Sequence, residues 1–344
     1  MNKNGDIIVS VGIAVYNAEK YIRQCLDSII EQKTDFKFEI IINDDCSTDN
    51  TQYIIKEYEA KYPDIIVPIF QTENQYSQGI GIMNNYIIPN VRGKYFSLCD
   101  GDDYWCDEYK LQKQVDFMDA HPDYTLCYHP AKMIYENEKH KPTIIGKSKR
   151  KNPQPYYELL KGNNIPAGSI MYRFNEVKNE LLNRPDDIYP GDWYNHIVVG
   201  NQGEIGYLPD VMYVYRWHSQ GISHTASDYP EKEIHLKYGI REVNFSYAVW
   251  NKVKDRYPQY YNEIFVPMLR DVYIAYLSES KLDEINILHQ KYSQYFKDIK
   301  FPNINLNKFE KIIKKYKKYK KLYNIFLIIS TIFAIIISIL LFLL

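Results

Sequence analysis

The sequence predicts an open α/β fold with a mostly parallel central β-sheet and flanking helices. The first observation is that short apolar runs rich in β-branched residues alternate with segments of helical periodicity between residues 7 and 128. The second is that two of these runs stop abruptly in acidic clusters. Ligands of open parallel sheets bind at the carboxyl ends of the strands, so we expect a functional site at this edge.

The expected elements follow one another at regular spacing. Asn17 follows the first apolar run and can cap a helix, and Pro63 ends the helix that follows the second run. Strands are expected over residues 7–15, 38–42, 65–70, 95–99 and 124–128. Helices are expected over residues 17–32, 79–88 and 107–120. A further helix, between the second and third strands, is expected to end at residue 62.

Composition limits the classes of function. The 344 residues suffice for one large domain with additions or for two domains. The net charge of −1 does not indicate a nucleic-acid-binding protein. Five scattered cysteines without a CxxC pair are typical of reduced thiols, and the polar first six residues are not typical of a secretory signal.

The acidic cluster after residue 99 is the clearest candidate site. Asp100, Asp102 and Asp103 lie within four positions, and Gly101 allows the chain to turn sharply between them. Crowded carboxylates repel one another, and a cation relieves that repulsion; oxygen ligands suit Mg²⁺ or Mn²⁺. No GxGxxG follows a strand and no GxxxxGK[ST] occurs, which disfavours a dinucleotide or P-loop site.

Three stretches resemble the N-terminal signatures of family 2 glycosyltransferases, an inverting group with the GT-A fold. They are Val11-Gly12-Ile13-Ala14-Val15-Tyr16-Asn17, Asn43-Asp44-Asp45-Cys46-Ser47-Thr48-Asp49 and Asp100-Gly101-Asp102-Asp103-Tyr104-Trp105. The family usually has Val and Gly where this chain has Asn43 and Cys46. The resemblance covers about residues 7–223.

The resemblance implies a site for a nucleotide sugar. Ala14 and Tyr16 would flank the base, with Tyr16 able to stack on it, and Asn17 completes the first signature. Asp45 would accept a hydrogen bond from the imide of the base, which favours a UDP-sugar.

The same resemblance implies a metal site that holds Mn²⁺ or Mg²⁺. Asp100 and Asp102 would contact the ribose and the metal. Asp103 is a further acid that can coordinate the metal, and which of the three acids binds the metal directly stays open. The stretch 205–218 resembles the strand that closes the sheet. Its end would present His218 to the metal or the diphosphate, while Arg216 would neutralise a phosphate.

Asp192 is the candidate general base. A carboxylate beside Trp193 in a glycine turn is placed to take a proton, and the stretch resembles the acidic base motif of the family. Asp192 can also cap the helix that follows it. Asp186 and Asp187 are alternatives, but they follow Pro185 in an expected surface loop.

The C-terminal third carries no recognisable chemistry but suggests a membrane. Residues 229–300 have a helical pattern, and Lys308–Lys321 holds eight lysines against one acid at helical spacing. Residues 325–344 contain no charged side chain and would span about 30 Å as a helix, one bilayer core. The expected organisation is a GT-A catalytic domain (1–228), a helical extension (229–300), a basic amphipathic segment (301–322) and a transmembrane helix (323–344).

The sequence therefore predicts a metal-dependent inverting glycosyltransferase. It would move a sugar from a nucleotide sugar to a hydroxyl of a glycan or lipid-linked acceptor, with no role for nucleic acid. The lysine-rich flank places the enzyme on the cytoplasmic side of the inner membrane. Two alternatives stay open: a catalytically inactive membrane-attached partner of another transferase, and another nucleotide-sugar enzyme such as a nucleotidyltransferase.

Overall fold

The computed structural model describes residues 6–136, 140–218, 221 and 230–300. The chain forms two compact units. The first consists of residues 1–230 and 241–265, and it contains the whole of the predicted catalytic region. The second consists of residues 231–240 together with the chain from residue 266 onward, of which 266–300 are described.

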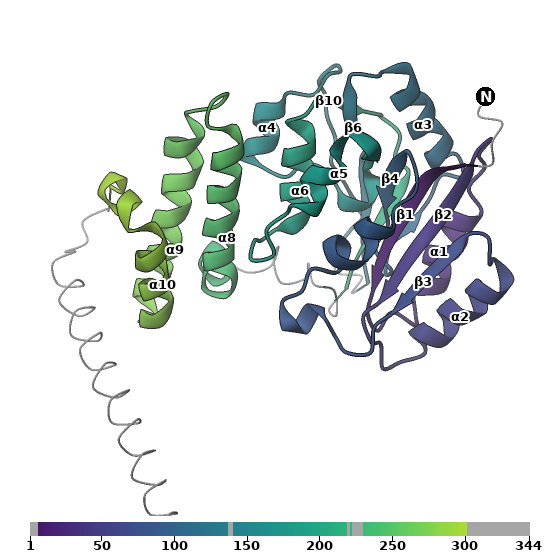
Figure 1. The fold of residues 1–344 in the computed structure, drawn as a ribbon, viewed down its shortest axis with the longest axis horizontal. Coiled ribbons are helices and arrows are strands. Elements are labelled where there is room, and N and C mark those ends of the chain that lie inside the picture. Colours follow the sequence, from purple (N-terminus) through teal and green to yellow (C-terminus); the bar gives the residue numbers. More distant parts are fainter. Residues whose placement is uncertain (1–5, 137–139, 219–220, 222–229, 301–344) are drawn as a thin grey trace, which may run out of the picture. The chain divides into compact units, whose positions relative to one another are not determined.

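A seven-stranded sheet lies at the centre of the first unit, and β1 to β3 lie side by side in it (Figure 1). The strand order is β10-β6-β9-β4-β1-β2-β3. The strands are β1 (Ile7–Val15), β2 (Lys37–Asp44), β3 (Ile66–Phe70), β4 (Tyr95–Leu98), β6 (Tyr124–Tyr128), β9 (Met171–Arg173) and β10 (Glu204–Tyr207). All neighbouring pairs are parallel except the two that involve β9. The predicted mostly parallel α/β sheet is confirmed.

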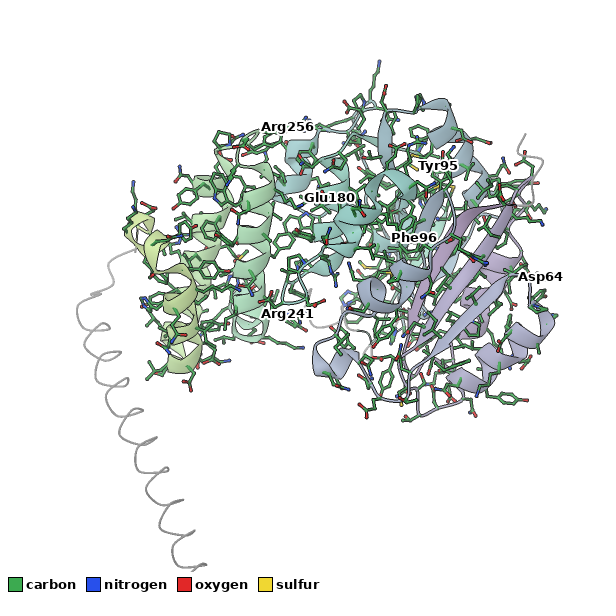
Figure 2. All side chains as sticks on the ribbon, viewed as in Figure 1. Asp64, Tyr95, Phe96, Glu180, Arg241 and Arg256 are labelled. Carbon is green, nitrogen blue, oxygen red and sulfur yellow. The ribbon has the colours of Figure 1, made fainter. Side chains whose placement is uncertain are left out.

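The central strands are buried on both faces, which explains their nearly continuous apolar sequence. Val9, Val11 and Ile13 of β1 are fully buried, as is Tyr95 of β4, and Figure 2 shows Tyr95 and Phe96 on that strand. A Cβ at Gly12 would lie 2.7 Å from Ile87, so glycine is needed for this close packing.

A second, four-stranded sheet has the order β5-β11-β7-β8. It contains β5 (Tyr104–Trp105), β7 (Ala131–Tyr135), β8 (Thr143–Ile145) and β11 (Tyr213–Trp217). The prediction of one closing strand over residues 205–218 is therefore wrong. The segment breaks around Pro209, and its halves, β10 and β11, belong to different sheets.

Helices connect the strands of the first unit. They are α1 (Ile22–Ile30), α2 (Thr51–Lys61), α3 (Lys110–Ala120), α4 (Tyr156–Lys161), α5 (Phe174–Leu182) and α6 (Gly191–Gly200). The helix expected over 79–88 is replaced by a short π-helix, η2 (Met83–Ile87), and a 3₁₀ turn, η3 (Ile88–Asn90). Gly79 has a left-handed backbone (φ 83°), so no right-handed helix begins there. Asn17 does not cap α1, which begins five residues later.

The described C-terminal part is helical, as predicted. It contains α8 (Glu231–Val253), η5 (Tyr261–Phe265), α9 (Val266–Ser278), α10 (Leu282–Tyr292) and η6 (Ser293–Asp298). No helix among the described residues is long and apolar enough to cross a bilayer. The predicted basic segment and transmembrane helix, residues 301–344, lie outside the described part of the chain.

Candidate functional site

The carboxyl ends of β1 and β2 are joined by side chain to backbone hydrogen bonds. Asn17 has a left-handed backbone (φ 50°), which asparagine tolerates better than most residues. Its Oδ1 accepts a hydrogen bond from the Thr48 amide (2.8 Å), and its own amide donates to Ser47 Oγ (2.8 Å). Asn17 thus holds the loop after β2 against the end of β1, and Tyr16 beside it is 50% exposed.

Asp44 and Asp45, at the end of β2, are buried, and three of their four side-chain oxygens accept hydrogen bonds; Asp44 Oδ1 has no partner among the described residues. Asp45 accepts hydrogen bonds from the amides of Gln75 (2.8 Å, to Oδ1) and Tyr76 (3.0 Å, to Oδ2). Asp44 accepts from the Ser47 amide (3.0 Å) and the Gln52 side chain (2.7 Å), both through Oδ2. Asp49 accepts from the Thr51 amide at the start of α2 (2.9 Å), so it satisfies the first amide of that helix.

We call residues 100–103 the acidic turn. The Asp103 amide donates to the Asp100 carbonyl (3.0 Å), and a Cβ at Gly101 would lie 2.7 Å from the Val15 side chain. The glycine therefore lets the turn pack directly on the end of β1. Water reaches the Asp100 side chain, yet protein atoms crowd it: this partial burial and the negative charges of Asp102 and Asp192 raise the pKa of Asp100 to about 7.

Asp103 differs from its neighbours because it is 1% exposed and both of its oxygens are engaged by β11. Oδ1 accepts a hydrogen bond from the Arg216 amide (2.6 Å), and Oδ2 accepts one from the Tyr213 hydroxyl. Burial and the charges of Asp102 and Asp100 raise the pKa of Asp103 well above its usual value. This acid joins the acidic turn to the second sheet, and its metal role stays a prediction.

The structure brings Asp102 and His218 together. His218 Nε2 lies 2.9 Å from Asp102 Oδ2, although the two residues are 116 positions apart in the chain. The His218 ring is 7% exposed and packs against Tyr21, with ring centroids 4.9 Å apart. Two groups of the predicted metal site are thus adjacent.

Arg216, the predicted phosphate-binding residue, is already tied to the acidic turn. Its Nε donates to the Asp102 carbonyl (2.9 Å), and one terminal nitrogen donates to Gln24 (2.8 Å). The guanidinium lies 4.9 Å from the Tyr21 ring centroid and 5.5 Å from that of Tyr104. The sequence contained no signal for these roles of Gln24 and Tyr21.

Asp192 lies in the first turn of α6, which begins at Gly191, so the prediction that Asp192 caps this helix is wrong; Pro190 is the capping residue and makes no side-chain hydrogen bond. Its Oδ2 accepts a hydrogen bond from Asn163 Nδ2 (3.2 Å), and Asn163 Oδ1 lies 3.2 Å from Nδ1 of the buried His196. The Asp192 charge contributes to the raised pKa of Asp100, so α6 places this carboxylate near the acidic turn. Asn163 and His196 are neighbours of the candidate base that sequence reasoning missed, because neither stands beside it in the chain.

The residues of the acidic turn fit a divalent cation of the Mg²⁺ or Mn²⁺ type. Among the described residues, no three acidic, histidine or cysteine side chains form a complete metal cage. Mg²⁺, however, binds to proteins through one or two carboxylates plus substrate phosphates. The adjacent Asp102 and His218, and the mutual repulsion that raises the Asp100 pKa, match such an open site.

Comparison with known proteins identifies the family. The family described as "Glycosyl transferase family 2" matches residues 10–181, which include the ends of β1 and β2 and the acidic turn. An uncharacterised protein of Mycobacterium tuberculosis, Rv1520, is 41% identical over 221 residues, which make up 64% of this chain. The chain spans 60% of the length of that relative.

Solved structures share the fold. The first 349 residues of Staphylococcus aureus TarS, in complex with UDP-GlcNAc, superpose with a TM-score of 0.54 at 18% identity, covering 87% of this chain and 95% of that one. The mannosyltransferase PcManGT of Pyrobaculum calidifontis, in complex with GDP-Man and Mn²⁺, gives a TM-score of 0.50 at 16% identity, covering 86% of this chain and 84% of that one. The chain belongs to glycosyl transferase family 2, which confirms the family that its three signatures resemble.

Proposed function

We propose that this chain is an active inverting glycosyltransferase that moves a sugar from a nucleotide sugar to an acceptor hydroxyl. One observation carries the proposal. The Asp192 carboxylate, from α6, lies near enough to the acidic turn to raise the pKa of Asp100. A general base near a diphosphate-binding edge is the arrangement that a single displacement at a sugar carbon requires.

The exposed Tyr16 and the buried Asp45 provide the base-binding side of the proposed donor site. The Tyr16 ring is half exposed and free to stack on a flat base. Asp45 accepts two backbone hydrogen bonds, and a carboxylate has about four acceptor positions, so it can still accept one from an imide. An imide donor favours uracil. The UDP-GlcNAc complex of TarS supports that choice, whereas the GDP-Man complex of PcManGT is consistent with a nucleotide sugar of another base.

In the proposed reaction, Asp192 takes the proton from the acceptor hydroxyl. Asn163 donates to one Asp192 oxygen and so orients the carboxylate for this step. The acceptor oxygen attacks the anomeric carbon from the face opposite the diphosphate, the bond to the diphosphate breaks, and the configuration inverts. Asp102 and His218 would hold Mn²⁺ or Mg²⁺, which when bound stabilises negative charge on the departing diphosphate.

The acceptor and its location form a further part of the proposal. Each lysine of the predicted basic segment 301–322 would gain about 1 kcal/mol near an anionic leaflet. Together with the apolar residues 323–344, this segment would anchor the chain to the cytoplasmic face of the inner membrane. An enzyme held there is suited to a glycan or lipid-linked acceptor.

The test measures release of the nucleoside diphosphate, UDP or GDP, by the full chain in detergent from a panel of UDP- and GDP-sugars, with Mn²⁺ and with EDTA. We expect release from one sugar only when metal is present. An Asp102→Ala variant should lower that rate at least about a hundredfold, because it removes one of the two adjacent metal-binding groups. An Asp64→Ala variant, altered at an exposed turn, is the matched control.

The outcomes separate the alternatives. Metal-dependent release that the Asp102→Ala variant loses would establish the donor site and name the sugar. If the unaltered chain binds no nucleotide with metal present, the proposal fails and an inactive partner of another transferase is the better description. A nucleotidyltransferase would need a phosphate-binding loop after β1, and Tyr16–Lys20 contains no glycine.

A further inference from the structure

Arg184, between α5 and α6, forms no ion pair with any described residue. Among the described residues, no carboxylate oxygen lies within 4.0 Å of its guanidinium, and its Nε has no hydrogen-bond partner. Arg23 and Arg92, by contrast, pair with Glu57 and Glu39. Burying Nε without a hydrogen bond is costly, and the two terminal nitrogens, which reach solvent, make no ion pair among the described residues. These two donors are therefore available to a ligand.

Two glycines make room for the Arg184 guanidinium. A Cβ at Gly81 would lie 2.6 Å from one terminal nitrogen, and a Cβ at Gly191 would lie 2.1 Å from the other. Any side chain at either position would displace the group. The two glycines therefore leave the space that the guanidinium occupies, beside the first turn of α6.

That place is next to the candidate base. Burial lowers the pKa of Arg184, while the negative charges of Asp186 and Asp192 act in the opposite direction. Asp192 is thus close enough to interact electrostatically but too far to form an ion pair. A group bound to Arg184 would lie beside the carboxylate that takes the acceptor proton.

We propose that Arg184 binds an anionic group, a phosphate or carboxylate, of a substrate that reaches Asp192. The planar guanidinium can donate two parallel hydrogen bonds to such a group. The group belongs either to the diphosphate of the nucleotide sugar or to an acidic acceptor. This inference rests on the proposed function, because it assigns a contact in the same site.

The variants are chosen to separate charge from fold. Arg184→Gln removes the cation. Gly81→Ala keeps the charge but moves the guanidinium, and it introduces no backbone strain because Gly81 does not have a positive φ. Arg23→Gln removes one charge from the exposed Arg23–Glu57 pair and is the matched control. Circular dichroism and thermal unfolding show whether each variant folds. If Arg184→Gln does not fold, the binding measurements on Gly81→Ala test the proposal.

Binding to the full chain is measured with three probes: UDP, uridine, and radiolabelled sulfate in the presence of saturating UDP and Mn²⁺ at constant ionic strength. If the donor diphosphate is the ligand, Arg184→Gln and Gly81→Ala weaken UDP about tenfold or more and leave uridine unchanged. If an acidic acceptor is the ligand, UDP binding is unchanged and sulfate binding is lost. Either result supports the proposal.

The proposal is overturned if Arg184→Gln matches Arg23→Gln with both UDP and sulfate, or if the unaltered chain binds neither probe. Arg184 would then act only as a structural neighbour of Asp192. A chain that binds no nucleotide but loses sulfate binding in Arg184→Gln would refute the proposed donor and still support the anion site. The two proposals therefore fail separately.

Discussion

The end of β2 and the acidic turn both present carboxylates at the carboxyl edge of the same sheet. Hydrogen-bond donors surround the first set, whereas the second set lies beside further negative charges. Asp44 and Asp45 are buried and accept hydrogen bonds from amides and a glutamine side chain. Asp100 is exposed, and the neighbouring negative charges of Asp102 and Asp192 contribute to its raised pKa. The fold itself supplies most hydrogen bonds to the carboxylates of the first region, which we interpret as a scaffold. The second region places like charges together, a repulsion that the proposed cation would relieve.

The largest expected effect is on catalysis at Asp192. Replacing a general base should lower the turnover rate by about 10² to 10⁴. An Asp192→Asn variant should therefore lose that much activity while its UDP affinity stays within about twofold of the unaltered chain. Steady-state kinetics and UDP titration measure the two quantities.

The control for this variant is Asp186→Asn, because Asp186 is exposed and precedes α6. We expect this variant to keep nearly full turnover. An active Asp192→Asn enzyme would remove Asp192 from the mechanism, and a loss of activity in Asp186→Asn alone would transfer the role to Asp186.

The scaffold region should lose stability when one of its acids is altered. Asp44 Oδ2 accepts two hydrogen bonds in a fully buried position, and an Asp44→Asn variant would replace the carboxylate that both donors bind by a neutral amide. We expect the free energy of unfolding to fall by about 1–3 kcal/mol. Urea denaturation measures it, with the exposed Asp64→Asn as control. Equal stability of the two variants would contradict the scaffold role.

Cys46 is a strained point within the scaffold. Cys46 has φ 63° at a position where family 2 glycosyltransferases usually have glycine. A left-handed backbone costs about 1–2 kcal/mol for a residue with a Cβ. Since glycine also loses more entropy on folding, a Cys46→Gly variant should gain only about 0.5–1 kcal/mol. Cys46→Ala, which keeps the Cβ, should gain nothing in the same thermal unfolding experiment. A gain of equal size in both variants would trace the effect to the thiol instead.

The smallest effect is expected at Asp100. In EDTA, Asp100→Asn should raise the free energy of unfolding, because the repulsion from Asp102 and Asp192 is removed. The gain should be below about 0.5 kcal/mol, since solvent screens an exposed carboxylate. Differential scanning calorimetry beside Asp64→Asn would detect it. A loss of stability would mean that the Asp100 carboxylate stabilises the fold without a cation, as the acids at the end of β2 are expected to do.

Local pattern was enough to predict much of the fold. β1, β2 and β4 are buried parallel strands, and a run of apolar residues is what burial on both faces requires. The two acidic clusters lie at the predicted edge because a parallel sheet aligns the carboxyl ends of its strands. The failures have local causes as well. The left-handed backbone of Gly79 (φ 83°) excludes a right-handed helix that begins there, and the chain around Pro209 divides an expected strand between two sheets.

The sequence by itself determined the fold class, the family and the residue types of the site, because these depend on periodicity and on short motifs. Only the tertiary structure decided which of those residues meet. It placed His218 against Asp102 across 116 positions, engaged both oxygens of Asp103 with β11, and left Arg184 beside Asp192 without an ion pair. Contacts between residues so distant in sequence arise from the packing of whole sheets and helices, and no local pattern encodes them.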